Sequence, residues 1–185
     1  MEADYSKIKT HPLFDPMKKI LEFFILGAIF VGQKDFQKLV LEQNPELKTL
    51  IDEYNKEVNL RVEGTQVKSN TKMYYVNISR LMAIGIFDIL QCSKYHNAVK
   101  NSTIFKFAKH IRNGAAHDNK FDLAPSIKNS ITWREFTITQ SLDKTTVFPD
   151  FIGAPTLIFL MQDLSEMIEK YEEKKNRRHI TQQGM

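Results

Sequence analysis

Residues 103–117 read TIFKFAKHIRNGAAH. Their apolar members recur at three-and-four spacing and share one arc of a helical wheel, which holds Ile104, Phe107, Ala108, Ile111 and Ala115. The opposite arc contains no acidic residue and carries Lys106, Lys109, His110, Arg112, Asn113, Ala116 and His117. The segment therefore predicts an amphipathic helix with one buried face and one uniformly basic face, opening at the possible caps Asn101, Ser102 and Thr103.

Further helices are predicted before this segment. Asp15-Pro16 is a start signal, because an N-cap acceptor precedes a proline at the first helical position, and the helix is expected to reach about Gly32. Residues 35–43 continue helically, Asn44-Pro45 breaks the pattern, residues 46–62 resume it and residues 64–69 suggest a loop. Residues 70–92 predict a long apolar helix, in which Gly85 indicates a close approach of another helix.

The pattern changes between residues 121 and 153. Residues 131–139 are rich in β-formers, residues 141–144 have turn character and residues 145–148 suit a returning strand, so we expect a β-hairpin insertion. Trp133 is expected to anchor this small sheet rather than to stack on a base. Ala154-Pro155 then begins a last helix that faces the core as far as Tyr171 and fades into a charged tail, about residues 172–185.

Length and composition bound the class of protein. The chain has 185 residues, of which 42% are hydrophobic and 26% charged, and this favours one globular domain over residues 1–185. Disordered, collagen-like and disulfide-stapled classes are excluded, the last because Cys92 is the only cysteine. The single cysteine excludes zinc sites built from cysteine pairs, and the five histidines show no metal-ligand spacing, so we expect no metal and no cofactor.

Charge is distributed unevenly along the chain. Residues 1–92 are balanced, and the excess of four positive charges lies entirely in residues 93–185. An excess of this kind suits binding to nucleic acid or phosphate, although a ragged basic tail also produces it. The N-terminus resembles no export leader, and the apolar run from Ile20 to Val31 is too short to span a bilayer, so we expect a cytoplasmic protein with no membrane partner.

The string Ile111-Arg112-Asn113-Gly114-Ala115-Ala116-His117 resembles the motif of the HEPN superfamily, an arginine followed by four to six residues and a histidine, often with asparagine after the arginine. The resemblance implies an all-α bundle of four to five main helices, with the motif near the end of a late helix. Here a small β-hairpin insertion, about residues 121–153, precedes the last helix. The resemblance also implies a catalytic site shared between two copies of the chain.

Arginine and histidine suit RNA cleavage without a metal. Attack of the 2′-hydroxyl on phosphorus needs a base, an acid for the leaving 5′-oxygen and a cation for the phosphate oxygens. His117 suits the proton transfers and Arg112 the phosphate, since imidazole titrates near neutrality and guanidinium is a permanently charged fork. Because acid and base must lie on opposite sides, a homodimer with two copies of His117 would complete the site.

Other residues have supporting roles in this interpretation. Asn113 would orient the histidine or donate to phosphate, and Lys109, His110 and Lys106 would contact neighbouring phosphates, although a solvated helix face explains those three equally well. Asp118 could pair with either Arg112 or His117. The basic run at residues 174–178 is expected to be a solvated helix end, with an extended positive rim as the alternative.

Three functions remain open. The first is a metal-independent endoribonuclease, for which the resemblance implies a role as a toxin or phage-defence effector. The second is a non-catalytic helical module that binds nucleotide, RNA or a partner protein, such as a cognate antitoxin or a nucleotidyltransferase. In that case Arg112 would hold a dimer together or cap a carboxylate. The third is a helical domain in which the motif occurs by coincidence.

Overall fold

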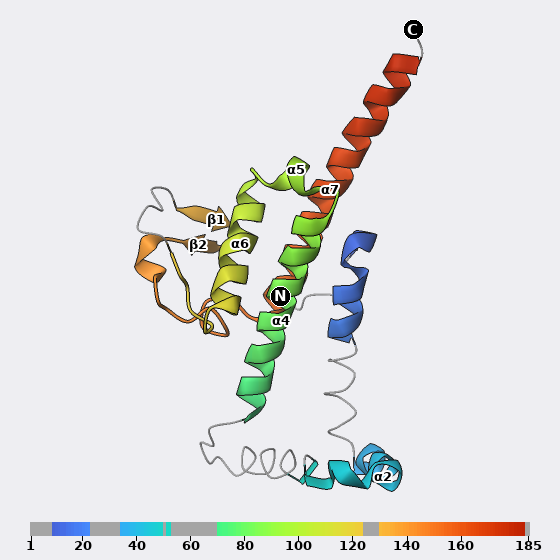
Figure 1. Ribbon diagram of the computed structural model, residues 1–185, viewed down its shortest axis with the longest axis vertical. Helices are drawn as coiled ribbons and strands as arrows, with labels where there is room; N and C mark the ends of the chain where they lie inside the picture. The colour runs from blue at the N-terminus through green and yellow to red at the C-terminus, as the bar shows by residue number, and fades with distance from the viewer. Residues whose placement is uncertain (1–8, 23–33, 50, 53–69, 124–129, 184–185) are drawn as a thin grey trace. The chain divides into compact units, whose positions relative to one another are not determined.

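The computed structural model describes residues 9–22, 34–49, 51–52, 70–123 and 130–183 (Figure 1). These residues are mostly helical, with one small antiparallel sheet, as expected for an all-α protein. The chain divides into two compact units, one of residues 1–17 with 78–185 and the other of residues 18–77. In the second unit, α2 (Lys34–Gln43) ends before Asn44-Pro45 as predicted, and the 3₁₀ turn η3 (Pro45–Leu47) follows. Residues 23–33 and 53–69, where further helix and a loop are expected, lie outside the described residues.

The first helical segment begins earlier than its sequence pattern suggests. The 3₁₀ turn η2 (Pro12–Phe14) leads directly into helical residues 15–22, so Asp15 is itself helical and is not the N-cap. The N-cap is His11, whose Nδ1 accepts a hydrogen bond from the Leu13 N–H at 3.1 Å. Pro12 supplies the proline that the first helical position favours. The predicted N-cap at Asp15 is therefore wrong, because the same pairing of acceptor and proline occurs four residues earlier, at His11-Pro12.

The long helix α4 (Asn70–Cys92) confirms the prediction for residues 70–92. Its residues 82–90 supply much of the core of the first unit, including Met82, Ile86 and Leu90. A Cβ added at Gly85 would lie 2.6 Å from the Met17 sulfur, so this glycine does mark the close approach of another helical segment. A short helix that the sequence pattern does not predict, α5 (His96–Val99), then leads to α6 (Thr103–Ala116).

The β-hairpin is present, but its strands are placed differently from the prediction. Strand β1 (Ile131–Trp133) pairs with β2 (Phe136–Ile138), so the turn consists of Arg134 and Glu135. The predicted returning strand at residues 145–148 forms one isolated bridge, between Thr146 and Lys120, instead of a strand. The 3₁₀ turn η4 (Gln140–Leu142) separates this bridge from β2 in the sequence. Arg134 adopts a φ of 49°, which is uncommon for a residue other than glycine. A turn without glycine or asparagine explains why residues 131–139 look like one strand.

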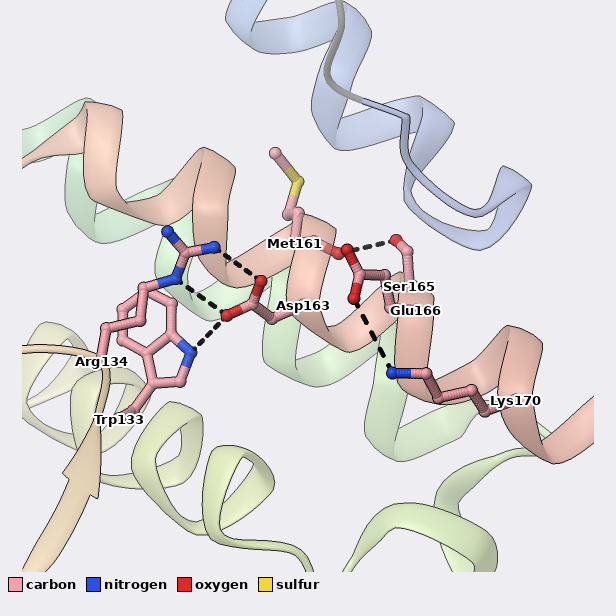
Figure 2. Close-up of polar contacts among 7 residues, drawn as sticks. All are labelled: Trp133, Arg134, Met161, Asp163, Ser165, Glu166 and Lys170. Carbon is pink, nitrogen blue, oxygen red and sulfur yellow. Dashed lines mark hydrogen bonds and ion pairs between the residues drawn. The ribbon is translucent and has the colours of Figure 1, made fainter. Parts of the chain in front are cut away.

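Tertiary contacts from the last helix, α7 (Ala154–Gln183), hold this turn (Figure 2). The Arg134 guanidinium donates two hydrogen bonds to Asp163, at 2.9 and 2.7 Å, and the Trp133 indole N–H donates a third at 2.9 Å. Arg134 also lies over the rings of Trp133 and Phe159. The Trp133 ring is buried against Phe107 of α6, which confirms its predicted role as a core anchor.

The last helix, α7 (Ala154–Gln183), is longer than predicted. The expected core positions are buried, namely Leu157, Leu160, Met161, Leu164 and Ile168. Tyr171, which is expected to face the core, is instead 41% exposed. The helix does not fade at Glu172 but runs on as one element of 30 residues to Gln183 (Figure 1). Among the described residues, no helix is long and apolar enough to cross a membrane.

Candidate functional site

Helix α6 presents the residues of the motif. The Ser102 hydroxyl accepts a hydrogen bond from the Phe105 N–H at 3.2 Å, so the middle one of the three possible caps begins the helix. One face is buried and consists of Phe105, Phe107, Ala108, Ile111, Gly114 and Ala115. The opposite face is exposed at Lys106, Lys109, Ala116 and His117, and partly exposed at His110, Arg112 and Asn113. The predicted division into a buried and a basic face is confirmed.

The small residues inside the motif have a packing role. Gly114 and Ala115 are buried at the end of α6. A Cβ on Gly114 would lie 2.5 Å from Val147 Cγ2 and 3.2 Å from the Lys120 carbonyl oxygen, so no larger residue fits without a shift of its neighbours. The segments after α6 and before α7 therefore pack directly against the helix at the level of the motif.

Arg112 is held by a carboxylate from α4. Its Nε donates a hydrogen bond to Asp88 Oδ1 at 3.1 Å, and the two side chains are 32% and 44% exposed, respectively. The contact uses the Nε position of the guanidinium, and within the described residues no hydrogen bond engages its Nη1 and Nη2 groups. Arg112 is thus oriented from one side and still has donors for a ligand.

A second arginine, Arg80 of α4, stabilises the end of helix α6. Arg80 Nε donates to the Ala115 carbonyl at 2.7 Å. Carbonyl groups in the last turn of a helix lack partners within the helix and carry partial negative charge, so a guanidinium there is favourable. Arg80 and Asp88 therefore connect α4 to the last turns of α6 at two points, Ala115 and Arg112.

His117 is the C-cap of α6 and is exposed. Its N–H still donates to the Asn113 carbonyl at 2.9 Å, but its ψ of 78° takes the chain out of the helix. Asp118 and Asn119 follow with φ of 54° and 58°, so the chain turns sharply after the histidine. Asp118 pairs with Lys120 at 3.6 Å, and in the described part of the chain it forms no ion pair with Arg112 or His117.

The turn after His117 is held by the side chain of Asn119. Its amide nitrogen donates to the Phe148 carbonyl at 2.6 Å, and its amide oxygen accepts from the Phe148 N–H at 3.0 Å.

Asp122 lies within electrostatic range of His117: the Lys144 ammonium is the main cause that lowers the pKa of the Asp122 carboxyl, and His117 adds a smaller effect. The imidazole of His117 receives no hydrogen bond from the residues that the structure describes.

The three residues predicted to contact phosphate differ in their surroundings. Lys106 and Lys109 are exposed. His110 is partly buried, and its Nδ1 lies in the interior without a hydrogen-bond partner among the described residues. Burial, and after it the charge of Lys109, lowers the pKa of His110, so this imidazole is neutral at pH 7. Its Nε2 is the nitrogen left for a ligand.

The site therefore comprises one oriented guanidinium and one exposed imidazole on the same short stretch of chain. No hydrogen bond or ion pair joins the side chains of Arg112, Asn113 and His117 to one another in the described part of the chain. Sequence reasoning missed Asp88 and Arg80. A signal for the first was present, since Asp88 is the only acidic residue between Asn70 and Cys92 and an isolated carboxylate in an apolar helix needs a partner.

The described residues contain no group of three or more His, Cys, Asp or Glu side chains that could hold a metal ion. In comparisons with known proteins, no family model matches the sequence, and no curated protein and no solved structure matches the chain.

Proposed function

We propose that this chain is a HEPN-type endoribonuclease that cleaves RNA by attack of the 2′-hydroxyl and needs no metal. The observation that carries the proposal is the Arg112 guanidinium, which Asp88 holds through Nε on a partly exposed face that also bears Lys109 and Asn113 and ends at His117. The resemblance of residues 111–117 to the HEPN motif supports the same reading.

The roles of the residues follow from the requirements of the reaction. The attacking 2′-hydroxyl loses a proton, the departing 5′-oxygen gains one, and charge accumulates on the two non-bridging phosphate oxygens. Arg112 would donate to those oxygens through Nη1 and Nη2, the groups that its contact with Asp88 leaves available. Asn113 would donate a further hydrogen bond to phosphate or orient His117.

A homodimer supplies the second proton-transfer group. The base and the acid of an in-line displacement stand on opposite sides of phosphorus, and each chain carries one motif histidine, His117. Two copies related by a two-fold axis would place one imidazole on each side of the scissile bond. The two imidazoles would titrate as a coupled pair, with one neutral and one protonated near neutral pH.

The experiment is cleavage of total bacterial RNA in EDTA by the wild-type chain and by two variants. His117→Ala removes the proton-transfer group, and we expect it to abolish cleavage. Lys100→Ala changes an exposed lysine outside α6 and serves as the matched control, with unchanged cleavage. The products are expected to end in a 2′,3′-cyclic phosphate. Equal cleavage by wild type and His117→Ala would show that the assigned site is wrong.

A second candidate function is favoured by the same ion pair. Arg112 is already paired with a carboxylate, as expected if it stabilises a non-catalytic module that binds nucleotide, RNA or a partner protein. The side chains of Arg112 and Asp88 are 32% and 44% exposed, respectively, and a partly exposed guanidinium can still reach a substrate, so we prefer the catalytic function. RNA binding without cleavage by the wild type would favour the module.

The biological role that we propose is that of a toxin or phage-defence effector in the cytoplasm, neutralised by a cognate antitoxin or a nucleotidyltransferase partner. Its test is growth of a bacterial host that expresses the wild-type chain or His117→Ala. We expect growth arrest with the wild type alone, together with cut sites in the total RNA.

A further inference from the structure

A hollow lies at the surface between the segment that joins α4 to α5 and the exposed part of α7. Its volume is about 290 Å³, and it is lined by Lys94, Tyr95, Tyr171, Glu172, Lys175 and Asn176. None of these residues belongs to α6 or to the motif. The volume is near the lower end of the range for small-ligand sites, and it suits one nucleotide rather than a whole coenzyme.

The acidic group in this hollow is already engaged. The Tyr95 hydroxyl donates a short hydrogen bond to Glu172, the His11 imidazole lies 3.6 Å from the same carboxylate, and the Lys94 ammonium lies 4.0 Å from it. The hydrogen bond from Tyr95 is the main cause that lowers the pKa of Glu172. These contacts fix Glu172 as part of the wall, and the groups that remain for a ligand are cationic, aromatic and amide groups.

Those remaining groups have the composition of a site for single-stranded nucleic acid. Lys175 is exposed and forms no ion pair with the described residues, and Lys94 has a side chain that is 78% exposed. Tyr171 is 41% exposed, although it follows the buried stripe of α7 at helical spacing. Proteins bind single strands by combining cations for the backbone with aromatic rings on which bases stack.

We propose that this hollow binds one nucleotide of a single-stranded RNA, with the base stacked on Tyr171, the phosphate held by Lys175 and Lys94, and the base edge contacted by Asn176. This RNA-binding hollow lies on different elements from the candidate cleavage site on α6. The choice of RNA rather than another anion rests on the proposed function, and the hollow would hold a part of the strand away from the scissile bond.

The test measures binding without cleavage. The probe is a fluorescein-labelled single-stranded RNA made wholly of 2′-O-methyl nucleotides, which lack the attacking hydroxyl, and the protein is the full chain. Tyr171→Ala is expected to weaken binding about fivefold or more, as loss of one stacked base predicts. Tyr171→Phe, which keeps the ring, is expected to bind within about twofold of the wild type.

Two neighbouring lysines provide a matched pair. Lys175 lines the hollow, whereas Lys174 is equally charged and exposed but does not line it. Lys175→Gln is expected to weaken binding more than Lys174→Gln and to reduce the slope of log Kd against log salt concentration by about 0.7. Circular dichroism of each variant confirms that it is folded.

Two results would overturn the proposal. One is equal weakening by Lys174→Gln and Lys175→Gln with no effect of Tyr171→Ala, which would mean diffuse electrostatic attraction. The other is displacement of the RNA by an oligo-glutamate peptide at a similar concentration, which would assign the hollow to acidic peptides. Both outcomes are independent of cleavage. A chain that binds the probe through Tyr171 but cuts no RNA would leave this site standing and refute the endoribonuclease.

Discussion

Arg112 and Asp88 lie 24 positions apart in the sequence and are joined by a hydrogen bond of 3.1 Å between Nε and Oδ1. The bond crosses from α6 to α4 and orients the guanidinium of the candidate site. A partly exposed ion pair contributes little to stability, about 0 to 1 kcal/mol. Its larger effect is geometric, because it restricts the rotamers of a long side chain before any ligand arrives.

The first prediction concerns Asp88 as a positioning residue. Asp88→Asn removes the charge that holds Arg112, so we expect thermal stability to change slightly and RNA cleavage to fall about 10- to 100-fold. Cleavage rates and melting temperatures of the same preparations check this. Asp118→Asn is the matched control, because it removes the same charge next to His117 from a residue that pairs with Lys120 rather than with Arg112. Equal losses in both variants would assign the effect to overall charge.

The second prediction concerns the glycine inside the motif. Gly114→Ala places a Cβ 2.5 Å from Val147 Cγ2, and we expect a loss of about 1 to 3 kcal/mol in the free energy of unfolding by urea. Ala116→Ser adds one atom at an exposed position of the same turn and is expected to change stability by less than about 0.5 kcal/mol.

A double variant tests whether the clash with Val147 is what destabilises Gly114→Ala. Val147→Ala removes the clashing methyl group, so Gly114→Ala combined with Val147→Ala should lose less than the sum of the two single losses. The Lys120 carbonyl remains near the new Cβ, and the rescue is therefore expected to be partial. Strict additivity would mean that Val147 is not the obstacle.

The third prediction concerns the chain segment that follows His117. Glycine tolerates the φ of 58° at position 119, but Asn119→Gly removes both hydrogen bonds to Phe148. We therefore expect the free energy of unfolding to fall by about 1 to 3 kcal/mol. Because the turn fixes the backbone that carries His117, cleavage should also decrease. Chemical unfolding and the cleavage assay test the two effects. A normal cleavage rate in a destabilised variant would show that His117 is positioned by α6 alone.

The fourth prediction is a pH dependence at the hairpin. Burial by itself raises the pKa of Asp163, but hydrogen bonds from Arg134 and Trp133 outweigh it, and the pKa of this carboxyl is lowered. A carboxylate with a lowered pKa in the folded state stabilises the protein above its unfolded pKa of about 3.9, and this stabilisation is lost as the pH falls through the folded pKa.

We therefore expect Asp163→Asn to lower the free energy of unfolding by about 1 to 2 kcal/mol at pH 7. Below about pH 4, where the wild-type carboxylate becomes protonated, the difference in stability between the variant and the wild type should become smaller. Melting temperatures between pH 2.5 and 7 measure this. Glu166→Gln is the control from the same helix, since its carboxylate pairs with Lys170 at 3.9 Å and accepts no hydrogen bond from the described residues of the hairpin (Figure 2). A constant difference between Asp163→Asn and wild type at all pH values would contradict the assignment.

Elements governed by local pattern could be predicted from the sequence. The bounds of α4, the capping region of α6 at residues 101–103 and the division of α6 into two faces follow from helical spacing and capping chemistry, which act over a few residues. The short helix α5 and the turn at Arg134 could not be predicted in this way. The Arg134 turn depends on Asp163, 29 positions away, and no local signal encodes that bond.

The features of the candidate site also divide into those that local sequence predicts and those that depend on packing. The position of Arg112, Asn113 and His117 at the end of one amphipathic helix could be predicted, because their spacing and the apolar stripe opposite them are properties of one continuous segment. Three other features are visible in the folded chain alone: Asp88 holds Arg112, Val147 requires a glycine at position 114, and Tyr171 is left exposed. Each of these depends on which segments pack together, and packing joins residues that are far apart in the chain.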